Sequence, residues 1–259
     1  MNTRSTVSAI VARDLTRALR QKGRVLGGLA RPFMWLLLVG SGYNGIAHVD
    51  GASSYQAFVF PGVVVMAALF GAMLTAIATV YDREFGMLRL MLSSPAGVPA
   101  VLLGRALAAT VVGFFQGGAI LMFVPLVVPV TGLQFTWAVA ALALGSATSS
   151  VLGLLVAAPL RSVENFAAIV NVVLFPLLFL SGALYPTTRM TPVLRFIARV
   201  NPVSYAVDLT RSALGQPAEF DATFSILALV ASTILAFTLT TLLFDPEQRF
   251  ILRNRPGKA

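Results

Sequence analysis

Long runs of apolar residues set the first limit on the fold of this chain. Residues 56–80, 135–158 and 223–244 contain no Asp, Glu, Lys or Arg. A helix rises about 1.5 Å per residue, so about 20 such residues cross the ~30 Å hydrocarbon core of a bilayer. Charged residues make up 11% of the 259 residues, whereas a soluble domain has about a quarter. The bilayer is therefore the solvent of this chain, and we expect an all-α membrane protein.

The apolar runs predict six membrane spans within a single domain that covers residues 1–259. Their approximate bounds are 32–47, 56–80, 98–128, 135–158, 163–184 and 223–244. Arg31 lies at the edge of the first span, and Arg105 lies near the inner end of the third. Before the spans, residues 1–24 predict an amphipathic helix in the headgroup layer, whose apolar face carries Val7, Val11, Leu15, Ala18 and Leu19. After the spans, residues 245–259 form a hydrophilic tail.

The distribution of Lys and Arg predicts the orientation of the spans. These residues are frequent in the N-terminal arm, in the connection after the second span and in the tail, whereas residues 48–55 and 129–134 have none. Cytoplasmic connections carry such an excess, so we expect both termini in the cytoplasm. Residues 186–221 should then lie outside, although they contain Arg189, Arg195, Arg199 and Arg211. A segment that dips partly into the membrane would ease this conflict.

The predicted extracytoplasmic segment, residues 186–221, contains two helix-start signals. Thr191-Pro192 and Asn201-Pro202 each combine a polar N-cap residue with proline at the first helical position. They predict short helices at about 192–200 and 202–214. Apolar residues recur along one side of each helix, so we expect both helices to lie on the outer membrane surface.

The residues of this chain offer little catalytic or ligand-binding chemistry. There is no cysteine, and the one histidine, His48, lies in a predicted loop without partner ligands, so we expect no metal and no cofactor. No pair of carboxylates is placed for acid–base catalysis, and no G-x-x-x-x-G-K-[ST] motif is present to bind ATP. The basic residues form no patch with aromatic residues, which excludes nucleic acid as a partner.

The polar residues within the spans point to packing rather than to transport of ions. An ion-coupled carrier needs ionisable groups inside the bilayer, and we expect none at mid-depth because the charges fall at span ends. The amides within spans, Gln116, Asn165 and Asn171, are interpreted as hydrogen-bonding groups between helices. The chain is therefore not expected to be an enzyme or to have its own source of energy.

A short charged stretch, residues 81–92, stands between the second and third spans. Phe85, Leu88 and Leu92 recur at helical spacing, while Asp82, Arg83 and Arg89 are expected to face away from them. Pro95 ends the predicted helix after about three turns. Such a helix can enter a groove on a soluble protein, or it can simply cap two spans at the interface. The pattern alone does not decide between the two.

Three stretches resemble one family of membrane proteins. They are 31-RPFMWLLLVGSGYNGI-46 after the amphipathic helix, 82-DREFGMLRLMLSSP-95, and 180-LSGALYP-186 followed by 201-NPVSYAVDLTR-211. Over essentially the whole chain, this order is similar to the permease subunits of the type-2 family of ATP-binding-cassette (ABC) transporters. The last stretch is close to that family's Asn-Pro-x-x-Tyr-x-x-Asp-x-x-Arg signature.

The resemblance implies a homodimer in the bacterial inner membrane, joined to two separate ATPase subunits that bind ATP and Mg. It also implies a coupling helix at 81–95, with ATPase contacts through Asp82, Arg83, Glu84, Gly86, Leu88 and Pro95. The same resemblance assigns an outer gate region to Gly182, Pro186, Asn201, Pro202, Tyr205, Asp208 and Arg211. The alternative for these outer residues is structural: helix caps, and an Asp208–Arg211 pair at i, i+3.

The family resemblance also suggests the cargo. Such families export bulky amphipathic molecules, namely drugs, lipids or lipid-linked glycans, and the scarcity of charge in the spans favours a hydrophobic or amphipathic cargo here. Two alternatives stay open. One is an autonomous channel or secondary carrier, and the other is a membrane-embedded lipid-processing enzyme, against which the absence of catalytic groups weighs.

Overall fold

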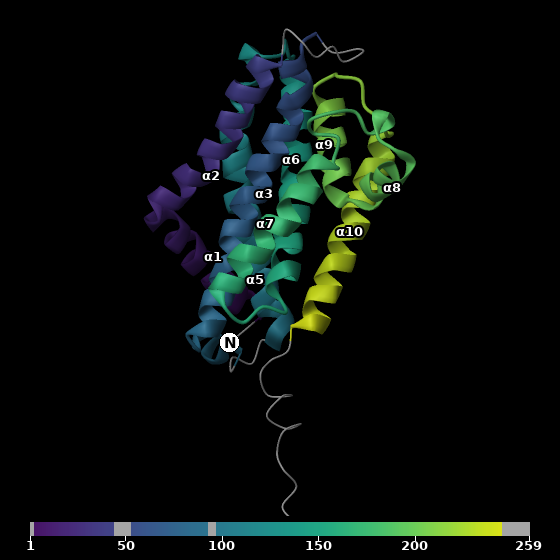
Figure 1. Cartoon of the computed structure of the whole chain (residues 1–259). Helices are drawn as coiled ribbons and strands as arrows, with labels where there is room; N and C mark the ends of the chain where they lie inside the picture. The colour runs from purple at the N-terminus through teal and green to yellow at the C-terminus, as the bar shows by residue number, and fades with distance from the viewer. Residues whose placement is uncertain (1–2, 44–52, 93–96, 245–259) are drawn as a thin grey trace, which may run out of the picture.

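The computed structural model describes residues 3–43, 53–92 and 97–244, and within these residues every regular element is a helix (Figure 1). The all-α prediction is confirmed. Long helices run side by side through the molecule, and the first two helices form a bent arm along one side. Two short helices gather at the end of the molecule opposite the N-terminus (Figure 1).

The helices follow the apolar runs closely, with two departures at the N-terminal arm. The predicted amphipathic helix ends at Arg20, and residues 22–24 already belong to the next helix. That helix contains Pro32 and continues as a π-helical turn at Trp35–Gly40.

The described helices are α1 Thr3–Arg20, α2 Lys22–Met34, α3 Tyr55–Glu84, α4 Met87–Leu92, α5 Gly97–Leu121, α6 Gly132–Ala157, α7 Val163–Phe179, α8 Pro192–Val200, α9 Pro202–Ala213 and α10 Ala222–Leu243.

Four helices among the described residues are long and apolar enough to cross a membrane. They are α3, α5 with the turn that extends it to Leu126, α6 and α10. The other two predicted spans correspond to shorter apolar helices, Leu26–Gly40 and Val163–Phe179. Helix α7 ends at Phe179, before the predicted bound of Leu184, and the chain then turns at Gly182, whose φ is +75°. The number of six spans stays a prediction.

Helix α3 is the centre of the fold, and close helix packing at small residues holds its neighbours against it. A Cβ atom on Gly113 would lie 2.7 Å from the Ala68 carbonyl oxygen, and one on Gly153 would lie 3.2 Å from the Ala76 Cβ. Helices α5 and α6 therefore approach α3 as closely as their backbones allow.

The two short helices differ from the prediction in their surroundings. Their bounds, 192–200 and 202–213, agree with the helix-start signals. Helix α8 lies at the surface with Val193, Phe196 and Ile197 exposed, but α9 is buried from Val203 to Arg211 against α3, α6 and α10. The prediction of a second surface helix is wrong because the polar side chains of α9 find partners inside the protein.

Candidate functional site

The predicted coupling helix is not one continuous helix. Helix α3 continues to Glu84, and the Phe85 and Gly86 N–H groups close it by donating to the Tyr81 and Arg83 carbonyl oxygens. Gly86 has a φ of +75°, a left-handed conformation that reverses the chain before α4 begins at Met87. The sequence prediction of a single helix over 81–92 is wrong because it overlooked this glycine. Pro95 lies outside the described residues.

Asp82 faces the protein interior rather than a partner, which corrects the prediction that it faces away. Its carboxylate pairs with the guanidinium groups of Arg105 on α5 and of Arg13 and Arg17 on α1. Arg105 is 1% exposed, and its Nη1 lies 3.8 Å from Asp14 Oδ2. A cluster of two acids and three arginines, which we call the inner charge cluster, therefore joins α1, α3 and α5. A buried pair of this kind is costly to break, because it would leave an uncompensated charge.

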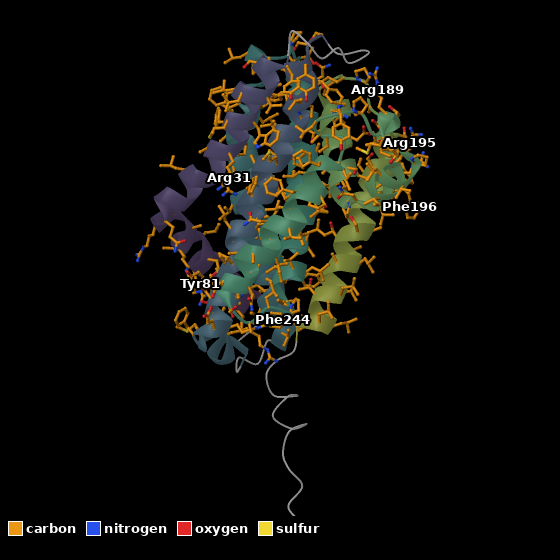
Figure 2. The ribbon with its side chains drawn as sticks, viewed as in Figure 1. Arg31, Tyr81, Arg189, Arg195, Phe196 and Phe244 are labelled. Atoms are coloured by element: carbon orange, nitrogen blue, oxygen red, sulfur yellow. The ribbon has the colours of Figure 1, made fainter. Side chains whose placement is uncertain are left out.

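Arg83 and Glu84 join the end of α3 to the α6–α7 connection and to the start of α7. Arg83 Nη1 donates to the carbonyl oxygens of Ala158 and Leu160, at 2.7 and 2.8 Å. Its guanidinium lies 4.7 Å from the ring centroid of Phe244, beyond the end of α10. Glu84 Oε2 accepts a 2.9 Å hydrogen bond from the Val163 N–H at the start of α7, where a negative charge is favourable. Figure 2 shows Tyr81 and Phe244 at this end of the molecule.

Next to the exposed Glu84, the turn at Gly86 presents apolar side chains. Phe85 is 75% exposed and Met87 is 47% exposed, and a Cβ atom on Gly86 would meet nothing within 4 Å. We call Phe85, Gly86 and Met87 the tip. Leu88 points the other way and packs against Leu102, Ala158 and Phe244. The sequence prediction placed Phe85 and Leu88 on one face; the turn at Gly86 separates them, and the side chains of Arg89 and Leu92 are not described.

At the opposite end, Asp208 and Arg211 bind backbone groups. Arg211 is buried, donates from Nη2 to the Gly182 carbonyl oxygen at 2.9 Å, and lies 4.3 Å from the Phe58 ring centroid on α3. Asp208 accepts the Glu219 and Phe220 N–H groups at 2.8 and 2.9 Å, while burial raises the pKa of this carboxyl. No ion pair joins the two in the described part of the chain, so the predicted Asp208–Arg211 pair is wrong.

The remaining residues predicted for the outer gate hold the turns around α9. Asn201 caps α9 by accepting the Val203 N–H at 3.0 Å, and its Nδ2 donates to the Leu177 carbonyl oxygen at 2.7 Å. Pro202 is the first residue of α9, and the Pro186 carbonyl oxygen accepts the Arg189 N–H. The Tyr205 hydroxyl donates to the Arg199 carbonyl oxygen, and its ring packs against Phe220 and Phe224. These contacts fit the structural interpretation of this region.

Arg31 lies deeper than the sequence suggested. It belongs to the apolar helix Leu26–Gly40, and its guanidinium is 5.3 Å from the ring centroid of Phe70, near the middle of α3. Figure 2 places it on α2 at about half the height of the molecule. The prediction that every charge falls at a span end is therefore wrong for this residue. An arginine does not lose its proton in a protein, so this one provides no proton relay.

Comparisons with known proteins point to a single family. Residues 5–215 match the family described as ABC-2 type transporter. The chain is 29% identical to nodulation protein J of Rhizobium leguminosarum bv. trifolii over 85% of this chain and 84% of the relative. It is 28% identical to the putative transport permease ycf38 of Pyropia yezoensis, over 79% and 72%.

A third relative carries a more specific name. The chain is 26% identical to the probable multidrug ABC transporter permease YbhR of Escherichia coli (strain K12), over 84% of this chain and 57% of that protein. The family match covers both the tip of α3 and the residues around α9. This chain, a multi-pass membrane protein, therefore belongs to the ABC-2 type transporter family and is an ABC transporter permease.

Proposed function

We propose that this chain is the membrane-spanning subunit of an ATP-driven exporter, with the tip of α3 as the contact for a separate ATPase. The observation that carries the proposal is an exposed aromatic side chain, Phe85, at the end of the most buried apolar helix. Phe85 and Met87 together form an exposed apolar patch, and such patches mark protein or membrane contacts. The family implies an ATPase partner, which would hold ATP and Mg, and we propose two copies of each subunit in a bacterial inner membrane, with both termini in the cytoplasm.

The bonds around the tip support its role in force transmission. The end of α3 is joined to α1 and α5 through Asp82, to the α6–α7 connection through Arg83, and to α7 through Glu84. A displacement of the tip would therefore move several helices together. Interfaces packed in this way shift between discrete arrangements rather than deforming continuously.

The other end of α3 extends this connection to the outer region. Helix α3 has 30 residues and is about 45 Å long. At its start, the Tyr55 hydroxyl donates to the Leu184 carbonyl oxygen at 2.9 Å, and Phe58 lies beneath Arg211. We propose that α3 carries the movement of the tip to residues 180–221, where the pathway would open outward.

The cargo we propose is hydrophobic or amphipathic. Phe and other apolar residues dominate the helices, and one relative is named as a probable multidrug permease. The name of the Pyropia relative gives no cargo. A carrier driven by ions is less well supported, since the cation at mid-height, Arg31, would repel a sodium ion and cannot donate its proton.

Co-purification with the ATPase tests the contact. Phe85→Ala and Met87→Ala should each weaken binding of the ATPase by about tenfold or more, as truncation of buried interface anchors does. The matched control is Leu133→Ala, because Leu133 is 70% exposed and lies at the opposite end of α6. Wild-type affinity for the ATPase in both tip variants, together with unchanged ATP-driven transport, would refute the proposal. Stimulation of ATP hydrolysis by candidate drugs and lipids in the reconstituted complex tests the cargo.

A further inference from the structure

A hollow lies between the bent arm and the bundle. It has a volume of about 200 Å³ and is lined by apolar residues from α1, α2 and α5 together with one amide, Gln116. Leu19 and Phe115 on its rim are 73% and 69% exposed, so the hollow is open to the surroundings of the bundle. Figure 1 shows the bend between α1 and α2 at the side of the molecule, away from the other helices.

Gln116 is an unpartnered polar group in the wall of this hollow. Its side chain is 3% exposed, and neither Oε1 nor Nε2 has a hydrogen-bond partner. Two glycines leave space for it: a Cβ atom on Gly28 or Gly71 would lie 2.9 or 2.8 Å from Oε1. Buried amides in proteins are nearly always hydrogen-bonded, so this amide retains the capacity to pair with a group that enters the hollow.

The position of Gln116 limits the kind of partner. It lies eleven residues beyond Arg105 on α5, about 16 Å along the helix from the inner charge cluster. Apolar side chains of Leu15, Leu29 and Val111 surround the hollow, so water alone is a poor occupant. A plain hydrocarbon would fill the space but leave the amide unpaired. A molecule with an apolar part and a hydrogen-bonding group satisfies both.

Charge near the hollow favours a neutral or anionic head group. A second, smaller hollow extends from Gln116 toward Asp14, Arg17 and Gln21 on the arm, and both Asp14 and Arg17 belong to the inner charge cluster. The sequence from residue 15 to residue 49 contains no Asp or Glu, whereas it contains Arg17, Arg20, Lys22 and Arg24. A cationic amphiphile would be repelled by these residues, and a carboxylate or carbonyl head group would be attracted.

We propose that this hollow binds a single-chain lipid, whose acyl chain lies against the apolar wall and whose carboxyl or carbonyl group pairs with the Gln116 amide. A cavity of 150 Å³ can hold benzene, so about 200 Å³ receives a short stretch of acyl chain. The rest of the chain lies along Leu19 and Phe115, where the hollow is open. The site belongs to this chain alone, and its existence does not depend on the ATPase contact proposed above.

Photolabelling in nanodiscs tests the site with diazirine-labelled palmitic acid as the probe. In the wild-type chain the label should attach near Phe115 and Leu19, and unlabelled palmitic acid should compete for it while hexadecane should not. Val111→Trp, which fills the hollow, should reduce labelling about tenfold. Met122→Trp is the matched control, because Met122 follows the same helix, is 69% exposed and does not line the hollow. It should leave labelling unchanged.

Gln116→Leu separates binding from folding. It should reduce labelling about tenfold, while its melting temperature stays at or above that of the wild type, since an unpaired amide is removed. A fall in melting temperature would show that the amide has a partner within the protein and would overturn the proposal. Labelling that spreads evenly over all exposed helix faces, without competition by palmitic acid, would also overturn it.

A second experiment identifies the source of the lipid. With the ATPase that co-purifies with this chain, release of the probe during ATP turnover identifies cargo, and retention of the probe identifies a resident membrane lipid. Either result supports the site. Loss of ATPase docking in the tip variants, with labelling intact, would leave the site standing, so the two proposals fail independently.

Discussion

Replacing Asp82 by Asn should destabilise the protein more than replacing any exposed charged residue would. Arg105, at 1% exposure, would then keep a single acidic neighbour, Asp14, whose Oδ2 lies 3.8 Å from it. Breaking a buried ion pair from one side costs about 3 to 5 kcal/mol. The remaining Asp14 places the expected loss at the lower end, about 3 kcal/mol. The cause is the buried guanidinium left without its main partner.

A double-mutant cycle with Arg105→Met checks this explanation. Arg13 and Arg17 keep 37% and 35% of their side-chain surface exposed, so water can solvate them when Asp82 is gone. The free energy of unfolding lost in the double variant should therefore be about 2 kcal/mol smaller than the sum of the losses in the two single variants. Because the pair is buried, raising the salt concentration should leave this coupling nearly unchanged.

Reversible unfolding of the reconstituted protein in sodium dodecyl sulfate, followed by tryptophan fluorescence, measures these free energies. The Asp82→Asn and Arg105→Met variants would be compared with the double variant at low and high salt. Additivity within about 0.5 kcal/mol would refute the coupling between these residues. A loss below about 1 kcal/mol for Asp82→Asn would indicate a solvated surface pair instead.

Four further predictions use the same reasoning. Gly86→Ala should cost about 1 kcal/mol in unfolding experiments and weaken ATPase binding, because an L-residue is strained at φ +75°. Glu84→Lys should weaken ATPase co-purification and increase amide exchange in the first turn of α7, whereas Glu84→Gln, which can still accept the Val163 N–H, should do so less. Arg211→Met should lower the melting temperature even without the ATPase, because the Gly182 carbonyl oxygen loses a buried donor. Burial raises the pKa of Asp208, so the stability that its protonated form contributes is complete below the ordinary Asp pKa and is lost as pH rises through the raised value. As the pH rises above the ordinary Asp pKa of about 4, the melting temperature of the wild type should therefore fall more than that of Asp208→Asn.

The sequence was sufficient for the helical elements, because apolar runs and caps act locally. The charge-free runs correspond to α3, α6 and α10 within four residues at each end, and the Asn201-Pro202 signal started α9 at the expected position. Each of these predictions depends on neighbours within about four positions, which is the range of helical hydrogen bonds and side-chain spacing. The family resemblance, which rested on such local motifs, was confirmed as well.

The arrangement of the candidate site depended on contacts that a single helix does not reveal. Asp82 and Arg105 are 23 residues apart and meet only because α3 and α5 pack side by side. A helical wheel of residues 81–92 therefore placed Asp82 on the outside. It also missed the exposure of Phe85, although Gly86, one residue further on, was a visible signal for a chain reversal.

The two buried arginines at the ends of α3 suggest why the helix would move as a unit. Arg105 is held by carboxylates that come from α1 and α3, so a relative shift of these helices would separate opposite charges. Arg211 is held by the Gly182 carbonyl oxygen and the face of Phe58, contacts that lack a full negative charge. Arg211 donates to a neutral carbonyl oxygen, whereas Arg105 pairs with an opposite charge, so the inner end is the firmer of the two. Movement driven at the tip should accordingly keep α1, α3 and α5 together and change the packing around Arg211 first.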